Sequence, residues 1–209
     1  MKVLMINGSP HKDGCTNAAL TIIADTLAEQ GIGSEIFQLG TQRISGCVAC
    51  GYCRKSGAKR CAIKDDAVNE LIDKLEAADG LIVGTPVYYA SPNGTLVSLL
   101  DRVFYAHGGY PHKPAAAIAS ARRAGTIVSV DELNKYFTIS QMPVVSSTYW
   151  NEVHGTRAED VAKDEEGRRH NQHGARRPCR RERACRGAER RTHRRCLPRH
   201  PRPRTDERG

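Results

Sequence analysis

The sequence predicts an α/β fold, a doubly wound, five-stranded parallel sheet with helices on both faces. Short apolar runs alternate along the chain with longer segments whose apolar residues recur at helical spacing. This alternation indicates parallel strands joined by right-handed crossovers. The chain has 209 residues, which is long enough for one domain with a buried core.

The strands are predicted from short apolar segments that stop at turn residues. KVLMIN (2–7) is apolar throughout and runs into a glycine-rich turn, as a strand buried on both faces does. SEIFQL (34–39) alternates apolar and polar residues, and LIVGTP (81–86) is another buried run that ends at a proline. Two more strands are expected at PAAAIAS (114–120) and PVVSS (143–147).

The segments between these strands are predicted to be helices. TNAALTIIADTLAEQG (16–31) has apolar residues at helical spacing and stops at Gly31. DDAVNELIDKLEAADG (65–80) begins with acidic residues, which complement the helix dipole. Further helices are expected at NGTLVSLLDRVFYA (93–106) and TIVSVDELNKYFTISQ (126–141).

The N-terminus MKVLMING is predicted to be a buried strand and not a signal peptide, because no small-residue cleavage site follows it. No apolar run of about 20 residues is present, so no transmembrane helix and no membrane partner are expected. We therefore expect a cytoplasmic protein. A reducing compartment argues against a disulfide framework.

Charge divides the chain into two regions. Residues 1–167 carry a net charge of −3, whereas residues 168–209 contain 16 Arg and 4 acidic residues, for a net charge of +12. The second region has one Leu and no Ile, Val, Met, Phe, Tyr, Trp or Lys, so it cannot bury a core and we expect it to be disordered. We therefore predict a domain at 1–167 and an Arg-rich tail at 168–209.

Ligands of doubly wound sheets bind at the carboxyl ends of the strands, which directs attention to the loops at 7–16, 85–93 and 120–126. NGSPHKDGCTN (7–17) joins the first strand to the first helix, and its small residues allow a tight turn. The free N–H groups and positive dipole end of that helix face the loop, which predicts a phosphate site. The loop matches neither the P-loop nor the G-x-G-x-x-G pattern. The alternative is an ordinary turn with Thr16 as the helix N-cap.

Taken together, these segments resemble the flavodoxin-like NAD(P)H-dependent FMN reductases over roughly residues 1–167. The resemblance is carried by NGSPHKDGCTN, GTPVYYASPNGTLVSLLDR, ARRAGT, VVSSTYWNEVHG and DEEG. It implies a flavodoxin-like fold and an FMN site whose phosphate is held by Ser9, Thr16 and Asn17. It also implies that the isoalloxazine ring lies along Pro86, Val87, Tyr88 and Tyr89. Residues 120–125 would form the far wall, with Ser120, Arg122 and Gly125 as candidate contacts.

Other residues of these loops have two interpretations each. Tyr88 or Tyr89 could stack on the ring or cover its edge, or could be a core or interface residue. Arg122 and Arg123 could meet a phosphate or be solvated loop charges. Two further candidates flank the phosphate loop, His11 and Cys15. His11 is expected to be an exposed polar residue and not a catalyst. Cys15 lies where a helix N-terminus could lower its pKa, although we expect it to pack behind the phosphate.

The resemblance implies an FMN-dependent oxidoreductase that works in two half-reactions. NAD(P)H would reduce FMN, and a quinone, an aromatic compound or an electron-carrier protein would reoxidise it. The flavin does the chemistry while the protein supplies orientation and electrostatics, so no catalytic side chain is predicted. Family members usually dimerise so that the partner helps to cover the flavin, and we expect a homodimer.

The Arg-rich tail departs from the family pattern. The resemblance implies that AEDVAKDEEG continues into a long amphipathic helix packed on the sheet, but here it gives way to Arg-, Pro- and His-rich sequence. The body contains 9 Lys and 7 Arg, whereas the tail contains Arg alone, as in a GC-rich gene translated in the wrong frame. We hypothesise a frameshift near Gly167, which the DNA sequence tests: the idea fails if no shifted frame restores an apolar-periodic helix. The alternative of a different class is a non-catalytic module that binds nucleic acid through the tail.

The segment GCVACGYCRKSGAKRC (46–61) contains four cysteines. Cys47, Cys50 and Cys53 are spaced C-x2-C-x2-C, and Cys61 follows after seven more residues. The spacing puts three thiols on a tight loop, as in ferredoxin cluster sites. It also resembles the iron–sulfur flavoproteins of the same family, which implies a [4Fe–4S] cluster that would pass electrons singly. Zinc, which commonly takes two separated C-x2-C pairs, and packing as small buried hydrophobes stay open as alternatives.

Overall fold

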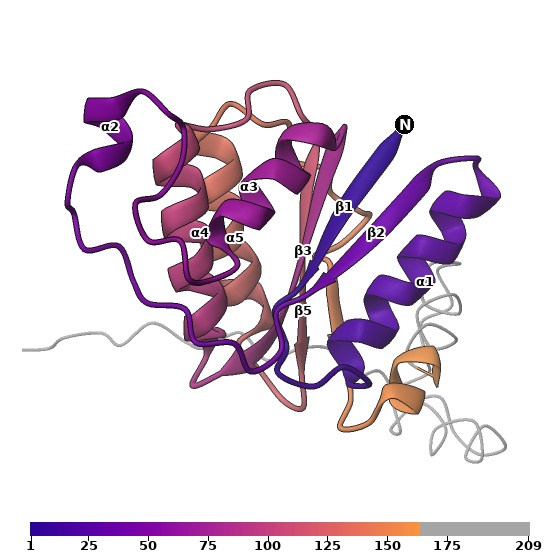
Figure 1. Ribbon diagram of the computed structural model, residues 1–209. Coiled ribbons are helices and arrows are strands. Elements are labelled where there is room, and N and C mark those ends of the chain that lie inside the picture. Colours follow the sequence, from indigo (N-terminus) through magenta and orange to yellow (C-terminus); the bar gives the residue numbers. More distant parts are fainter. Residues whose placement is uncertain (164–209) are drawn as a thin grey trace, which may run out of the picture. The chain divides into compact units, whose positions relative to one another are not determined.

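The computed structural model describes residues 1–163, and its centre is a parallel sheet with helices on both faces (Figure 1). The strands are β1 (Lys2–Asn7), β2 (Gly33–Gln38), β3 (Gly80–Tyr88), β4 (Ser91–Pro92), β5 (Ala115–Ala121) and β6 (Glu152–His154). Five of them run parallel in the order β2-β1-β3-β5-β6, while the short β4 pairs antiparallel with the end of β3. The strand order reverses between β1 and β3, which makes this a doubly wound sheet and confirms the predicted fold class.

The sheet separates the core into two parts, and helices cover both faces. The helices are α1 (Cys15–Glu29), α2 (Tyr52–Ser56), α3 (Val68–Ala77), α4 (Gly94–His107) and α5 (Thr126–Ile139). The larger cluster of buried residues contains Leu4 and Ile6 of β1 and side chains of α3, α4 and α5. The smaller cluster contains Met5 of β1, Leu20 of α1 and Val161. Alternate residues of β1 thus serve opposite faces, which explains why KVLMIN is apolar throughout.

The strand predicted at 143–147 is wrong. Only a single bridge, between Val144 and Ala115, forms within residues 143–147. The edge strand of the sheet is β6, which is centred on Val153. Val144 and Val145 are 36% and 53% exposed, whereas Val153 is 5% exposed. The sheet therefore continues where an alternating segment can bury one side chain, and not where two adjacent valines follow a proline.

The segment before α3 also differs from the prediction. The helix begins at Val68 and not at residue 65, because Asp66 accepts a hydrogen bond from the Val68 N–H at 3.2 Å and turns its carboxylate towards α4. The short elements α2 and β4 were not predicted. Both matter for the site, since α2 carries Cys53 and β4 closes a hairpin on β3.

Within residues 1–163, no helix is both long enough and apolar enough to cross a membrane. Residues 1–163 belong to one compact unit. The Arg-rich tail and the frameshift hypothesised near Gly167 lie outside the described residues, and both stay predictions.

Candidate functional site

The loops that follow β1 and β3 meet at the carboxyl edge of the sheet. The Gly8 N–H donates to the Gly84 carbonyl at 2.8 Å. The Asn93 side chain donates to the Gly8 carbonyl at 2.7 Å, and the Asn93 N–H donates to the Thr85 hydroxyl at 3.0 Å. A Cβ on Gly8 would lie 2.5 Å from Leu96 Cδ2 and 2.8 Å from the Gly84 oxygen, so this close approach requires glycine.

Helix α1 presents unpartnered N–H groups to this edge. Its N-cap is Gly14, which has no side chain to accept from the first turn. Among the described residues, no backbone acceptor pairs with the N–H groups of Cys15, Thr16 and Asn17, and the first such bond runs from Ala18 to Gly14. Three donors and the positive end of a four-turn helix therefore face the loop at 8–14, which is the arrangement that binds a phosphate.

Thr16 is not the helix N-cap. Its hydroxyl lies 2.8 Å from the Ser120 hydroxyl, and both side chains are buried. This contact ties the start of α1 to the carboxyl end of β5 and brings the predicted residues Thr16 and Ser120 together.

A buried polar network beneath the loop fixes Ser9. The Asn7 carboxamide accepts from the Ser9 N–H at 3.0 Å and donates to Gln38 at 2.6 Å, and Gln38 donates in turn to the Ser9 carbonyl at 2.8 Å. The Ser9 hydroxyl accepts from the His11 N–H at 3.1 Å. Its own proton is left for a further acceptor, while the His11 side chain is exposed, as expected.

Two other predicted residues lie around the start of α1. Asn17 accepts a long hydrogen bond from Asn7 at 3.4 Å, so it joins the same network. The Cys15 thiol faces the segment after β6 and donates to the Arg157 carbonyl at 3.2 Å. Burial, helped by Asp160, raises the pKa of Cys15 above its ordinary value. The backbone N–H of Cys15 itself acts to lower the pKa, but burial and Asp160 outweigh it, so the pKa is not lowered at this helix N-terminus.

The loop after β3 is a strained hairpin. Tyr89 and Ala90 both have positive φ, at 49° and 62°, and form the two-residue turn between Tyr88 and Ser91. Non-glycine residues adopt this conformation at a cost, and such residues cluster at binding sites. The turn presents Tyr89 outward with its side chain wholly exposed, and Tyr88 is 46% exposed.

Gly125 brings the third loop against this hairpin. Its φ is +96°, and a Cβ there would lie 2.8 Å from Val87 Cγ1 and 2.9 Å from Ala90 Cα. The loops at 85–93 and 120–126 are therefore in contact, and the half-buried Pro86 and Val87 lie at their junction. Arg122 and Arg123 are exposed at the end of β5.

The four cysteines line one small pocket. The pocket is shared with Val48, Ile63 and Tyr105. Cys47 and Cys50 are exposed, whereas Cys53 on α2 and Cys61 are half-buried, and all four are free thiols. Within residues 1–163, no three His, Cys, Asp or Glu side chains are arranged so that they could hold a metal ion. The donor set is thus of the right kind for a cluster but is not gathered into a ligand shell.

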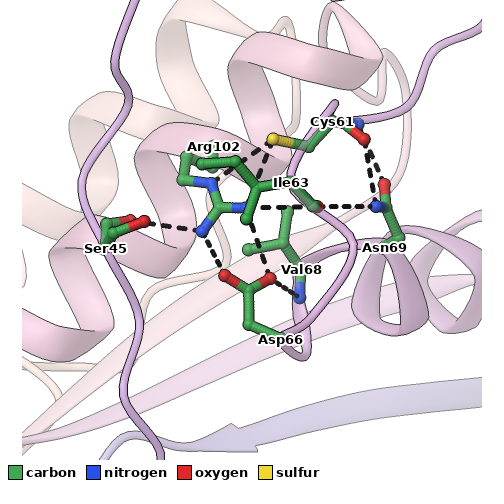
Figure 2. Close-up of polar contacts among 7 residues, drawn as sticks. All are labelled: Ser45, Cys61, Ile63, Asp66, Val68, Asn69 and Arg102. Carbon is green, nitrogen blue, oxygen red and sulfur yellow. Dashed lines mark hydrogen bonds and ion pairs between the residues drawn. The ribbon is translucent and has the colours of Figure 1, made fainter.

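A residue that the sequence analysis did not single out organises the cysteine segment. Arg102 is 1% exposed and lies at the end of the LLDR motif on α4. Figure 2 shows its guanidinium between Asp66, with which it forms an ion pair, and the sulfur of Cys61. Burial alone would lower the pKa of Arg102, but its hydrogen bonds to Asp66 and Cys61 outweigh burial and raise it. The only sequence signal was the charged pair Asp101–Arg102 within a largely apolar helix.

The chain is similar to known proteins in sequence and in fold. The family model described as NADPH-dependent FMN reductase matches residues 1–156. Two iron–sulfur flavoproteins of Methanocaldococcus jannaschii are each 32% identical to the chain: one alignment covers 69% of the chain and 76% of the relative, the other 81% and 90%. A flavodoxin from the domain Archaea superposes with a TM-score of 0.52 at 15% identity, covering 78% of the chain and 90% of that structure. That last likeness shows the flavodoxin-like fold.

Proposed function

Because the chain belongs to the NADPH-dependent FMN reductase family, we propose that it is an FMN-dependent NAD(P)H oxidoreductase. In this proposal it passes two electrons from the nicotinamide cofactor to a quinone, an aromatic compound or an electron-carrier protein. One observation carries the proposal: three free N–H groups of α1 and the Ser9 hydroxyl face one loop, beside a strained hairpin at the switch point of the sheet.

The phosphate of FMN fits the start of α1. The N–H groups of Cys15, Thr16 and Asn17 would donate to its oxygens, and the helix dipole favours its negative charge. Ser9 adds a hydroxyl donor that the Asn7 network holds in place. The Thr16 hydroxyl is engaged with Ser120, so its part is to orient the helix start.

The flavin ring fits against the hairpin and the Gly125 loop. Pro86, Val87 and Tyr88 would form one wall, and residues 120–125 would form the other. When bound, FMN supplies a centre that accepts hydride from the nicotinamide and passes the electrons on. The protein's own contribution is to orient the ring, exclude water and hold the phosphate. No general acid or base is assigned.

We further propose that Cys47, Cys50, Cys53 and Cys61 bind a [4Fe–4S] cluster. Their common pocket and the relatives that are named iron–sulfur flavoproteins support this assignment. A bound cluster supplies a carrier of single electrons, which suits a protein acceptor. A purely structural role for the cysteines or a zinc ion are the competing assignments.

A homodimer in the cytoplasm is also proposed. The fully exposed Tyr89 at the rim of the proposed ring site is suited to contact a second subunit. The five cysteines of the described region are all free, which suits a reducing compartment.

The test uses the full chain, purified anaerobically. The proposal predicts a yellow protein whose melting temperature rises with added FMN and rises less with riboflavin, because riboflavin lacks the phosphate. NAD(P)H should bleach the flavin absorbance until an acceptor is added. A folded protein that neither binds FMN nor is stabilised by it would refute the proposal. Iron and sulfide analysis tests the cluster independently, and a zinc assay tests the main alternative.

A further inference from the structure

Arg102 uses its whole guanidinium to hold the cysteine segment. Nε and Nη2 donate to the Cys61 sulfur at 3.4 and 3.3 Å. Nη1 donates to the Ser45 carbonyl at 3.2 Å and pairs with Asp66, and Nη2 also reaches the Ile63 carbonyl at 3.4 Å. One rigid side chain on α4 therefore fixes the beginning and the end of the segment 45–66 (Figure 2).

Cys61 differs from the other three cysteines in being fixed. Besides the two bonds to its sulfur, its backbone N–H donates to the Asn69 side chain at 2.9 Å, and Asn69 donates back to the Cys61 carbonyl at 3.1 Å. Cys47 and Cys50 are exposed on the loop, and Cys53 lies on the five-residue helix α2. Cys53 and Cys61 both pack against the larger core cluster, and of the four thiols it is that of Cys61 that accepts hydrogen bonds from Arg102.

We propose that Arg102 is a positioning residue for the cluster, acting through Cys61. It holds the Cys61 sulfur in place before the cluster assembles. Once the cluster is bound, its two N–H···S bonds make the cluster easier to reduce. The redox effect follows because hydrogen bonds to ligand sulfurs raise the reduction potential of iron–sulfur centres. This inference rests on the proposed cluster.

Lysine cannot replace arginine in this role. An ammonium is a point charge with three donors, whereas the guanidinium presents five donors in a planar fork. The contacts here need that fork, since two donors serve one sulfur while others reach Ser45 and Asp66. Asp66 balances the buried positive charge, so the pair is neutral before the thiolate ligand adds its negative charge.

The experiment compares three variants with the wild type. Arg102→Lys keeps the charge and loses the fork. Arg102→Met combined with Asp66→Asn removes both charges, so that no unpaired carboxylate is left to unfold the protein. Arg54→Met is the matched control, because it removes an exposed positive charge of the same segment, one that lies over the Tyr105 ring and not against Cys61. Each chain is reconstituted anaerobically with iron and sulfide, and the cluster potential is measured by dye-mediated titration. The apo proteins are treated with iodoacetamide, and alkylation of each cysteine is followed by mass spectrometry.

Both Arg102 variants should shift the reduction equilibrium at least tenfold towards the oxidised cluster, which is about 59 mV for a one-electron couple. In the apo protein, alkylation of Cys61 should rise at least tenfold while that of Cys47 and Cys50 stays within twofold. The Arg54 variant should change neither. Unchanged potential and unchanged Cys61 alkylation in both Arg102 variants would overturn the inference. A wild type that takes up no iron would refute the cluster itself. A faster Cys61 alkylation in the variants would then still support the positioning of the sulfur.

Discussion

Replacing Ser9 with alanine tests the proposed phosphate site most directly. Ser9 is 4% exposed, and its hydroxyl accepts from the His11 N–H at 3.1 Å, so its proton is available to a phosphate oxygen. A hydrogen bond to a charged group contributes about 1.5–3 kcal/mol. The Ser9→Ala variant should therefore bind FMN about 10- to 150-fold more weakly.

The same substitution has a smaller effect on the empty protein. It removes the acceptor of the His11 N–H, a neutral bond at a partly exposed site, which is worth about 0.5–1.5 kcal/mol of the free energy of unfolding. The Asn7–Gln38 network beneath the loop does not involve the hydroxyl and should stay intact. The loss of FMN affinity is thus predicted to exceed the loss of stability.

The assay is flavin fluorescence quenching on apo protein, with FMN and riboflavin titrated side by side and urea unfolding measured in parallel. Ser34→Ala, at an exposed serine of β2 far from the proposed phosphate site, is the control and should bind both flavins as the wild type does. If Ser9→Ala weakened FMN and riboflavin equally, the hydroxyl would be serving the fold and not the phosphate. If it left FMN affinity within twofold, the placement of the phosphate would be wrong.

Three further predictions concern the Gly125 loop and two groups of polar contacts elsewhere in the fold. Gly125 has a φ of +96°, and an added Cβ would lie 2.8 Å from Val87 Cγ1, so Gly125→Ala should destabilise the protein by about 2 kcal/mol or more in urea unfolding. It should also weaken FMN binding. An unchanged affinity for FMN would show that this loop does not line the ring site. Lys113→Met removes an ammonium that donates to three carbonyls at the end of α3 at 2.6–2.7 Å. It should cost about 1–3 kcal/mol of stability without changing the Kd for FMN. Glu35→Gln should lower stability at pH 7 by less than about 1 kcal/mol, because hydrogen bonds from Lys2 and Lys74 lower the pKa of Glu35 below its ordinary value of 4.5. Because that stability is lost as pH falls through the lowered pKa, the variant and the wild type should converge in acid; a gap that persists at low pH would contradict the assignment.

Residues whose role is set by neighbours in the sequence were the easiest to predict. KVLMIN reads as a strand buried on both faces because its side chains alternate between two cores, and the structure confirms it. The loop at 7–17 was predicted to meet the start of a helix, and the free N–H groups of α1 follow from that adjacency alone.

Residues whose role is set by contacts across the chain were missed or misplaced. The edge strand was predicted at 143–147, but burial of Val153 placed it at β6. Thr16 was considered as a helix cap, but its hydroxyl meets Ser120, more than a hundred residues away. The charged pair Asp101–Arg102 did not reveal the role of Arg102, because its partners lie in a segment that the sequence alone cannot place against α4.

Most of the alternation of strands and helices, the junction of the loop at 7–17 with a helix start and the spacing of the four cysteines follow from the sequence, since each depends on residues a few positions apart. Only the tertiary structure decided which strand closes the sheet, which thiol is held and which buried cation holds it. These outcomes depend on burial and on hydrogen bonds between distant segments, and such contacts form only when the chain has folded.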